Sequence, residues 1–216
     1  MKFAPYSYSK IHCFQTCPRK FEYCYVQKIK SDKDNLALVK GSNIHTCLET
    51  GDYEGEYKDI LLSFANSKIG QDILSKESVK EYQIKLDSNF EPASKDANDH
   101  LFVGYIDRVN KSDVIEIIDF KTGKYKEPQY QSYLQLIYYS LYIIKKYNLE
   151  KVKIRYVYVE HNKENSMFIT KKDIPLYTES LKKAIQEMED CNYYYKNQQI
   201  LCDYCEFRSL CDKDLK

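Results

Sequence analysis

Residues 101–124 read LFVGYIDRVNKSDVIEIIDFKTGK, and this stretch decides the fold class. Two apolar runs within it, 101–109 and 114–121, have the pattern of β-strands. The short polar segment between the runs is typical of a tight turn. The stretch therefore predicts a β-hairpin in which the strand that carries Asp107 pairs with the strand that carries Asp119.

The same hairpin carries the densest group of chemically useful side chains. Asp119 and Lys121 are two residues apart on one strand, so both side chains point to the same face. Asp107 on the paired strand brings a second carboxylate to this place. Carboxylates with water are the ligands that Mg²⁺ and Mn²⁺ prefer, and a nearby ammonium can position a water or stabilise charge on a phosphate. The alternative is a surface ion pair across two strands.

The periodicity of the chain outside the hairpin alternates between helical and strand patterns. This order predicts an α/β core with a mixed sheet flanked by helices. The expected helices cover residues 7–28, 41–50, 55–76, 127–148 and 173–196; the expected strands cover 79–87, 101–109, 114–121, 152–159 and 166–170; residues 31–40 are expected to form a loop.

Composition excludes several classes of protein. The chain has 216 residues, 33 basic and 32 acidic, and its net charge of +1 argues against a purely electrostatic nucleic-acid binder. No apolar run approaches the roughly 18 residues of a membrane span, and the N-terminus lacks the apolar core of a secretory signal. We therefore expect a cytoplasmic protein without a membrane partner.

Eight cysteines in a chain without a secretory signal point to metal binding or catalysis rather than to disulfides. The C-terminal tail holds Cys202, Cys205 and Cys211, which is one thiolate short of the usual four ligands of zinc or an iron–sulfur cluster. The best candidate for the fourth ligand is Cys17, in Cys-Pro-Arg-Lys-Phe, with Cys13 in reserve. The remaining cysteines lack metal-ligand spacing, and all four outside the set are expected to be small buried side chains: Cys13, Cys24, Cys47 and Cys191.

Four motifs taken together resemble the RecB-like branch of the PD-(D/E)XK nuclease superfamily. Their order and approximate spacing agree with that branch. Phe120 stands where the family has Tyr, a minor departure because the family uses the backbone carbonyl at this position. The motifs are Gly41-Ser-Asn-Ile-His45, Gly104-Tyr-Ile-Asp107-Arg108, Asp119-Phe-Lys121-Thr-Gly123 and Gln135-Leu-Ile-Tyr-Tyr139.

The resemblance implies a restriction-endonuclease-like core and a role for each matching residue. Lys121 would orient or activate the attacking water, while Gln135 and Tyr139 would face DNA or brace Lys121. Glu81 is a weaker candidate for a further ligand, with a structural role as the alternative. The implied ligands of Mg²⁺ or Mn²⁺ are His45, Asp107, Asp119 and the carbonyl of Phe120.

The cysteine pattern is similar to that of the iron–sulfur members of this branch, which include AddB-type nucleases and the CRISPR-associated Cas-four family. The resemblance implies a 4Fe–4S cluster on Cys17, Cys202, Cys205 and Cys211, with zinc as the alternative. It also implies one nuclease domain over residues 1–216. Within it, residues 41–170 would form the catalytic core, and residues 1–30 with 198–216 a small cluster-binding lobe.

The function that the resemblance implies is a metal-dependent DNA exonuclease, acting on single-stranded ends. Such an enzyme would serve CRISPR adaptation, or phage or cellular recombination and repair. The chain has no Gly-x-x-x-x-Gly-Lys-Ser/Thr motif, so DNA unwinding would need a helicase partner, and an integrase is another expected partner. The alternatives are a catalytically silent DNA-binding or assembly module and a redox-sensing DNA-binding protein.

Overall fold

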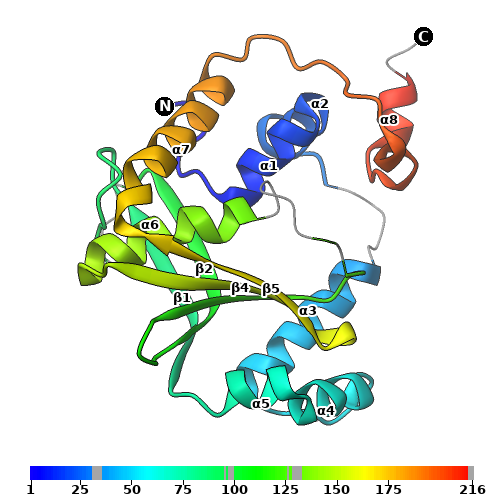
Figure 1. The fold of residues 1–216 in the computed structure, drawn as a ribbon. Coiled ribbons are helices and arrows are strands. Elements are labelled where there is room, and N and C mark those ends of the chain that lie inside the picture. The colour runs from blue at the N-terminus through cyan, green and yellow to red at the C-terminus, as the bar shows by residue number, and fades with distance from the viewer. Residues whose placement is uncertain (31–35, 95, 97–99, 126, 128–132, 214–216) are drawn as a thin grey trace.

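A five-stranded sheet forms the centre of the described part of the chain, with strand order β1-β2-β3-β4-β5 (Figure 1). The computed structural model describes residues 1–30, 36–94, 96, 100–125, 127 and 133–213. The expected hairpin is present as β2 and β3. The strands are β1 Ser78–Leu86, β2 Phe102–Asn110, β3 Glu116–Lys121, β4 Lys151–Tyr158 and β5 Lys163–Thr170.

The sheet is mixed, as the sequence predicts. β1 and β2, β2 and β3, and β4 and β5 pair antiparallel, whereas β3 and β4 pair parallel. A parallel pair needs a crossover connection, and helix α6 (Leu134–Tyr147) provides it. The α/β prediction is therefore confirmed.

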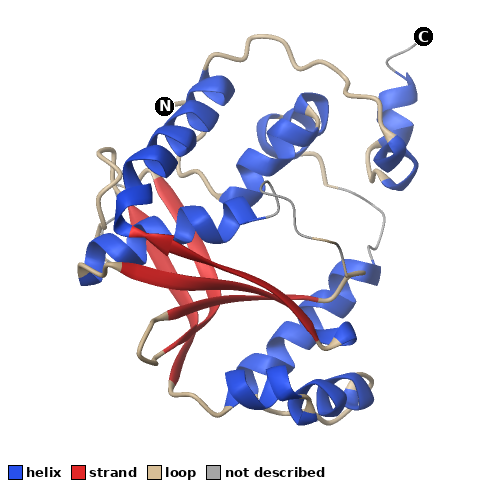
Figure 2. Ribbon diagram, in the orientation of Figure 1, coloured by secondary structure: helices blue, strands red, loops and turns tan. Residues whose placement is uncertain are grey.

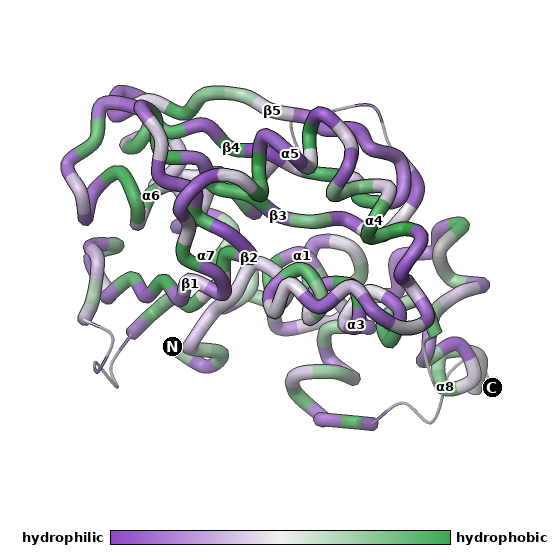
Figure 3. The backbone as a smooth tube through the Cα atoms, turned by 90° about the horizontal axis from the view of Figure 1, so that it is seen from below, coloured by the Kyte–Doolittle hydropathy of each residue, from purple (hydrophilic) through white to green (hydrophobic). Residues whose placement is uncertain are grey.

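Helices cover both faces of the sheet, as Figure 2 shows. β3 serves both layers because its side chains alternate: Ile117 joins a core with α1, α6 and α7, whereas Ile118 and Phe120 join a second core with α3, α4 and α5. Hydrophobic and hydrophilic residues alternate along the strands and helices in the view of Figure 3. No helix among the described residues is long and apolar enough to cross a membrane.

The helix expected over residues 7–28 is interrupted at Cys17, so this prediction was wrong in its extent. Cys17 has an extended backbone (φ −159°, ψ 107°) because the ring of Pro18 disfavours a helical residue before it. Three short segments replace the single helix: α1 Tyr8–Thr16, α2 Pro18–Phe21 and a π-helical turn η1 Glu22–Val26.

The boundaries of other expected elements also differ. The helix expected over 55–76 breaks at Ser67, whose hydroxyl accepts from the Gly70 N–H and caps a new helix. The helix expected from 127 is described only from Leu134, because residues 128–132 lie outside the described part. Helix α3 takes in five residues of the expected loop, and β5 starts three residues before its expected first residue. The observed helices are α3 Leu36–Thr50, α4 Lys58–Asn66, α5 Lys68–Leu74 and α7 Ile174–Glu189.

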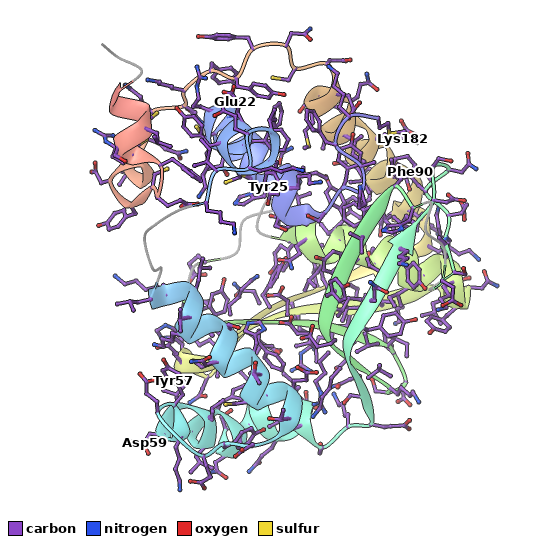
Figure 4. All side chains as sticks on the ribbon, turned by 180° about the vertical axis from the view of Figure 1, so that it is seen from behind. Glu22, Tyr25, Tyr57, Asp59, Phe90 and Lys182 are labelled. Carbon is purple, nitrogen blue, oxygen red and sulfur yellow. The ribbon has the colours of Figure 1, made fainter. Side chains whose placement is uncertain are left out.

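The tail beyond α7 runs without regular structure to the short helical segments η5 (Ile200–Tyr204) and α8 (Arg208–Lys213). It returns to the N-terminal helices, so α8 lies near α2 in Figure 1. On the opposite side, the loop after β1 packs on α7, where Lys182 Nζ lies 5.7 Å from the ring centroid of Phe90 (Figure 4).

A buried ionic network joins α5 to three strands. Arg155 on β4 is only 2% exposed and contacts carboxylates of Asp72, Glu116 and Glu164 at 2.7, 3.1 and 2.6 Å. Glu116, also buried, accepts in addition from Lys76 at 3.0 Å. Each charge in the network has partners of opposite sign, which is the condition under which buried ions are tolerated.

Replacement of Arg155 by methionine leaves Glu116 with less compensation and should lower the free energy of unfolding by about 3 kcal/mol. Urea denaturation measures this loss. The matched control is Lys58→Met, which removes an exposed ion pair with Glu54 and should barely move the urea midpoint. Equal midpoints for Arg155→Met and the wild type would contradict the importance of the network.

Candidate active site

Strands β2 and β3 separate at Asp107 and Asp119. Their pairing runs from Asn110↔Glu116 to Arg108↔Ile118 and then stops. One step further, the backbone N–H of Phe120 donates to Oδ2 of Asp107 at 2.7 Å instead of to a backbone carbonyl. The separation therefore leaves two carboxylates, one from each strand, at the end of the ladder.

The pairing of β1 with β2 is also interrupted beside Asp107. The paired residues step from Lys80↔Arg108 to Tyr82↔Ile106, and Glu81 between them has φ 46°. A positive φ is rare for a residue other than glycine. Glu81, Asp107 and His45 line one small pocket. Burial and the charge of Asp107 raise the pKa of Glu81.

Helix α3 brings His45 to Asp107 from one face of the sheet. Nδ1 of His45 lies 3.4 Å from Oδ2 of Asp107, and the hydrogen bond to this carboxylate raises the pKa of the imidazole although burial opposes it. A Cβ on Gly41, one turn earlier, would lie 3.3 Å from the Thr122 hydroxyl. The glycine thus allows α3 to approach the end of β3 closely.

Asp119 and Lys121 form an ion pair, with Nζ of Lys121 2.6 Å from Oδ2 of Asp119. The carboxylate is only 7% exposed, and burial first, then the charge of Asp107, raises its pKa to about 6. Oδ2 is enclosed and makes no hydrogen bond of acceptable geometry with the described residues, because Lys121 approaches it off the favoured direction. A buried carboxylate oxygen of this kind has spare capacity to bind a cation.

Helix α6 fixes Lys121 from the other face of the sheet. Nζ of Lys121 donates to Oε1 of Gln135 at 3.2 Å, and Gln135 is hydrogen-bonded in turn to the hydroxyl of Tyr139. Burial raises the pKa of Tyr139, so its hydroxyl stays protonated. A Cβ on Gly104 would lie 2.4 Å from the Tyr139 ring, so glycine is required for the ring to lie against β2.

Tyr156 also belongs to the site, although sequence reasoning missed it. It pairs with Asp119 across the parallel strands, and its ring centroid lies 4.9 Å from Nζ of Lys121. Its hydroxyl accepts from the N–H of Leu136 at 3.3 Å, which holds the first turn of α6 beside Lys121. No local motif marks Tyr156, because its role depends on the register of β3 against β4.

The structure therefore places together all the side chains that the sequence predicts for the catalytic site. Among the described residues, no three His, Cys, Asp or Glu side chains already have the convergent geometry of a metal site. The two carboxylates nevertheless fit a hard divalent cation, since carboxylate oxygens are its preferred ligands and Asp119 Oδ2 lacks a hydrogen bond, whereas the imidazole of His45 is a ligand more typical of transition-metal ions.

A second site lies between the N-terminal helices and the tail. A cavity of about 310 Å³ is lined by Cys17, Cys202, Cys205 and Cys211, the four cysteines predicted as one ligand set. The backbone N–H of Gln199 donates to Sγ of Cys202 at 3.4 Å. Such hydrogen bonds to sulfur tune iron–sulfur clusters. The cavity has room for a metal centre, and its four thiols suit zinc or an iron–sulfur cluster.

Contacts on both sides of this cavity tie the tail to the N-terminus. Side-chain amides of Asn197 and Gln199 donate to the carbonyl of Thr16 at 2.8 and 3.0 Å, directly before Cys17. Lys20 pairs with Glu206 at 3.0 Å. These contacts hold the two ends of the chain together.

The remaining cysteines were predicted to be small buried side chains, and the structure shows them only partly buried. Cys13 and Cys24 are hydrogen-bonded to each other, which occupies the thiol that was the reserve ligand. Cys47 packs against the core of α3, α4 and α5, and Cys191 packs against the other core.

Comparison with known proteins agrees with this geometry. The sequence model of the PD-(D/E)XK nuclease superfamily matches residues 5–212, and the chain belongs to this superfamily. No curated protein matches the sequence. A solved structure described as "Putative exonuclease" from Eubacterium rectale is similar in fold (TM-score 0.51, 9% identity, 92% of this chain and 91% of that chain). The crystal structure of SSO0001 gives a TM-score of 0.48 at 16% identity, over 95% of this chain and 86% of that chain.

Gly104→Ala should force the Tyr139 ring out of place and destabilise the protein by about 2 kcal/mol, the usual cost of overpacking. Urea denaturation measures the change. The control is Gly123→Ala in the neighbouring motif, where an added Cβ meets nothing within 4 Å. In a Tyr139→Ala background Gly104→Ala should cost much less. A full cost in that background would exclude the ring as the cause.

Proposed function

We propose that this chain is a Mg²⁺- or Mn²⁺-dependent DNA exonuclease that acts on single-stranded ends. The observation that carries the proposal is the meeting of Asp107, Asp119 and Lys121 where β2 separates from β3, with His45 beside them. Membership of the nuclease superfamily and the fold of the exonuclease-named protein support it.

Asp107, Asp119, His45 and the Phe120 carbonyl would hold the cation. A divalent cation bound there supplies Lewis acidity and lowers the pKa of a bound water. The side chain of Lys121 is 39% exposed, and its ammonium is held by Asp119, Gln135 and the ring of Tyr156. In this position it orients the attacking water and offsets charge on the phosphate.

The cysteine-lined cavity is proposed to hold a 4Fe–4S cluster. Four cysteines from the two ends of the chain line this one cavity, which supports a shared ligand set, and zinc on the same thiols is the alternative. A cluster on Cys17 and the tail would close a loop of nearly the whole chain, which limits the entropy of the unfolded state.

The cellular setting that we propose is CRISPR adaptation, or phage or cellular recombination and repair, with an integrase or a helicase as partner. The sequence motifs support this setting through the resemblance to RecB-like nucleases. Two other functions are the alternatives: a DNA-binding or assembly module without cleavage, and a DNA-binding redox sensor.

Wild-type protein purified without oxygen should degrade end-labelled single-stranded DNA with Mn²⁺ or Mg²⁺ and should be inactive in EDTA. Asp119→Asn should lower the rate at least about a hundredfold, because it removes a carboxylate that binds the cation. Gel analysis of the products measures both rates and shows the polarity of digestion.

Two controls make this result specific. Glu179→Gln changes an exposed carboxylate on α7 and should retain full activity. A circular single strand has no ends and should survive; its cleavage would exclude a strict exonuclease. Metal-loaded wild type that binds DNA but cuts no substrate would favour the binding module.

Cys17→Ala and Cys202→Ala should each lose the brown colour of the cluster and melt at a lower temperature. Visible absorption, iron analysis and thermal melting measure these losses. Cys47→Ala on α3 is the matched control, because this thiol does not line the cavity. A colourless wild-type protein that contains one zinc per chain would show that the cavity holds zinc and not a cluster. Unchanged spectra in both variants would refute the ligand set.

A further inference from the structure

Helix α1 carries two aromatic rings toward the catalytic residues. Tyr8 and His12 are one helical turn apart and stack on each other, with ring centroids 5.6 Å apart and an interplanar angle of 11°. Tyr8 is half-buried and packs edge-on against Tyr138 of α6 at 6.5 Å. The outer ring of the pair, His12, is exposed. The two stacked rings therefore form a flat surface, in which Tyr8 is held by Tyr138 and His12 is exposed.

The pair lies beside the helix that carries two residues of the candidate active site. Tyr8 packs on Tyr138, and the same helix α6 carries Gln135 and Tyr139. Burial first, then the charges of Tyr138 and Asp119, raises the pKa of Tyr8 to about 12. Partial burial and the positive charges of Lys121 and Lys20 lower the pKa of His12, which favours the uncharged ring.

Two cations near this pair, Lys10 on α1 and Lys20 on α2, are already engaged. Nζ of Lys10 donates to the carbonyls of Phe3 and Pro5, each at 2.8 Å, and Lys20 is paired with Glu206. Both ammonium groups therefore already have hydrogen-bond partners within the protein. An exposed neutral ring backed by a second ring instead suits another flat aromatic group.

We propose that Tyr8 and His12 form a stacking platform for an unpaired nucleobase next to the scissile phosphate. The inference rests on the proposed nuclease function and adds a specificity element to it. Base–aromatic stacking tolerates every base, because each has a π-face, but it requires the base to be unstacked from a duplex. The platform therefore selects single strands by shape and not by sequence.

The test combines protein variants with oligonucleotides in which one abasic nucleotide is moved stepwise from the end. Affinity is read by fluorescence anisotropy in the Asp119→Asn background, where no cleavage is expected. His12→Ala should weaken binding of the intact strand about tenfold, as loss of one stacked base does. In the protein that keeps His12, an abasic nucleotide at one position of the strand should weaken binding by a similar factor.

The decisive result is the combination of the two changes. His12→Ala should cause no further loss of affinity when the abasic nucleotide occupies that position, because both changes remove the same contact. His12→Phe keeps a ring and should restore binding to within about twofold of unchanged His12, because any aromatic face can stack. Gln15→Ala, an exposed residue of the same helix, should bind normally.

Unchanged affinity of His12→Ala, or an undiminished abasic effect in His12→Ala, would overturn the platform. Cleavage by the otherwise wild-type chain separates the two proposals. If that chain cuts DNA and His12→Ala behaves normally, only the platform fails. If it cuts no DNA with Mg²⁺ or Mn²⁺, the nuclease function fails, whatever the anisotropy shows.

Discussion

The separation of β2 from β3 at Asp107 and Asp119 is the constraint on which the candidate active site depends. A continued ladder would use the Phe120 N–H in the sheet. Here the Asp107 carboxylate takes this donor, and the ladder beside Glu81 is interrupted as well. Buried backbone donors must find acceptors, so the Asp107 side chain both ends the β2–β3 ladder and stays fixed at its end. The end of the β2–β3 ladder and the candidate active site therefore depend on the same carboxylate, that of Asp107.

Two independent layers of helices meet at this place. α3 belongs to the core with α4 and α5, whereas α6 belongs to the core on the opposite face. Each layer contributes a polar group to one end of the hairpin: His45 to Asp107, and Gln135 to Lys121. The burial that raises the pKa of Asp119 is a cost of this arrangement, and the ammonium of Lys121 offsets part of it. A bound cation would offset more.

The sequence predicts the parts of the molecule that follow local rules. The strand patterns around the hairpin and the motif spacings identify the sheet, and the structure places His45, Asp107, Asp119, Lys121 and Gln135 together. The helix over residues 7–28 was predicted too long, because the prediction followed the periodicity of the apolar residues and gave too little weight to Pro18. Tyr156 was missed because only the register of two strands that are far apart in sequence brings it to Lys121. Contacts between distant segments leave no periodic signal.

The break at Cys17 has a consequence for the whole N-terminal region. An unbroken helix would carry Cys17 on in the direction of α1, whereas the extended residue before Pro18 turns α2 toward the tail and the cysteine-lined cavity. α1 ends at this break, where the side-chain amides of Asn197 and Gln199 in the tail donate to the Thr16 carbonyl. The same helix packs on α6 through Tyr8 and Tyr138. One short helix therefore contacts both the tail, which carries three of the cysteines that line the cavity, and the helix that carries Gln135 and Tyr139.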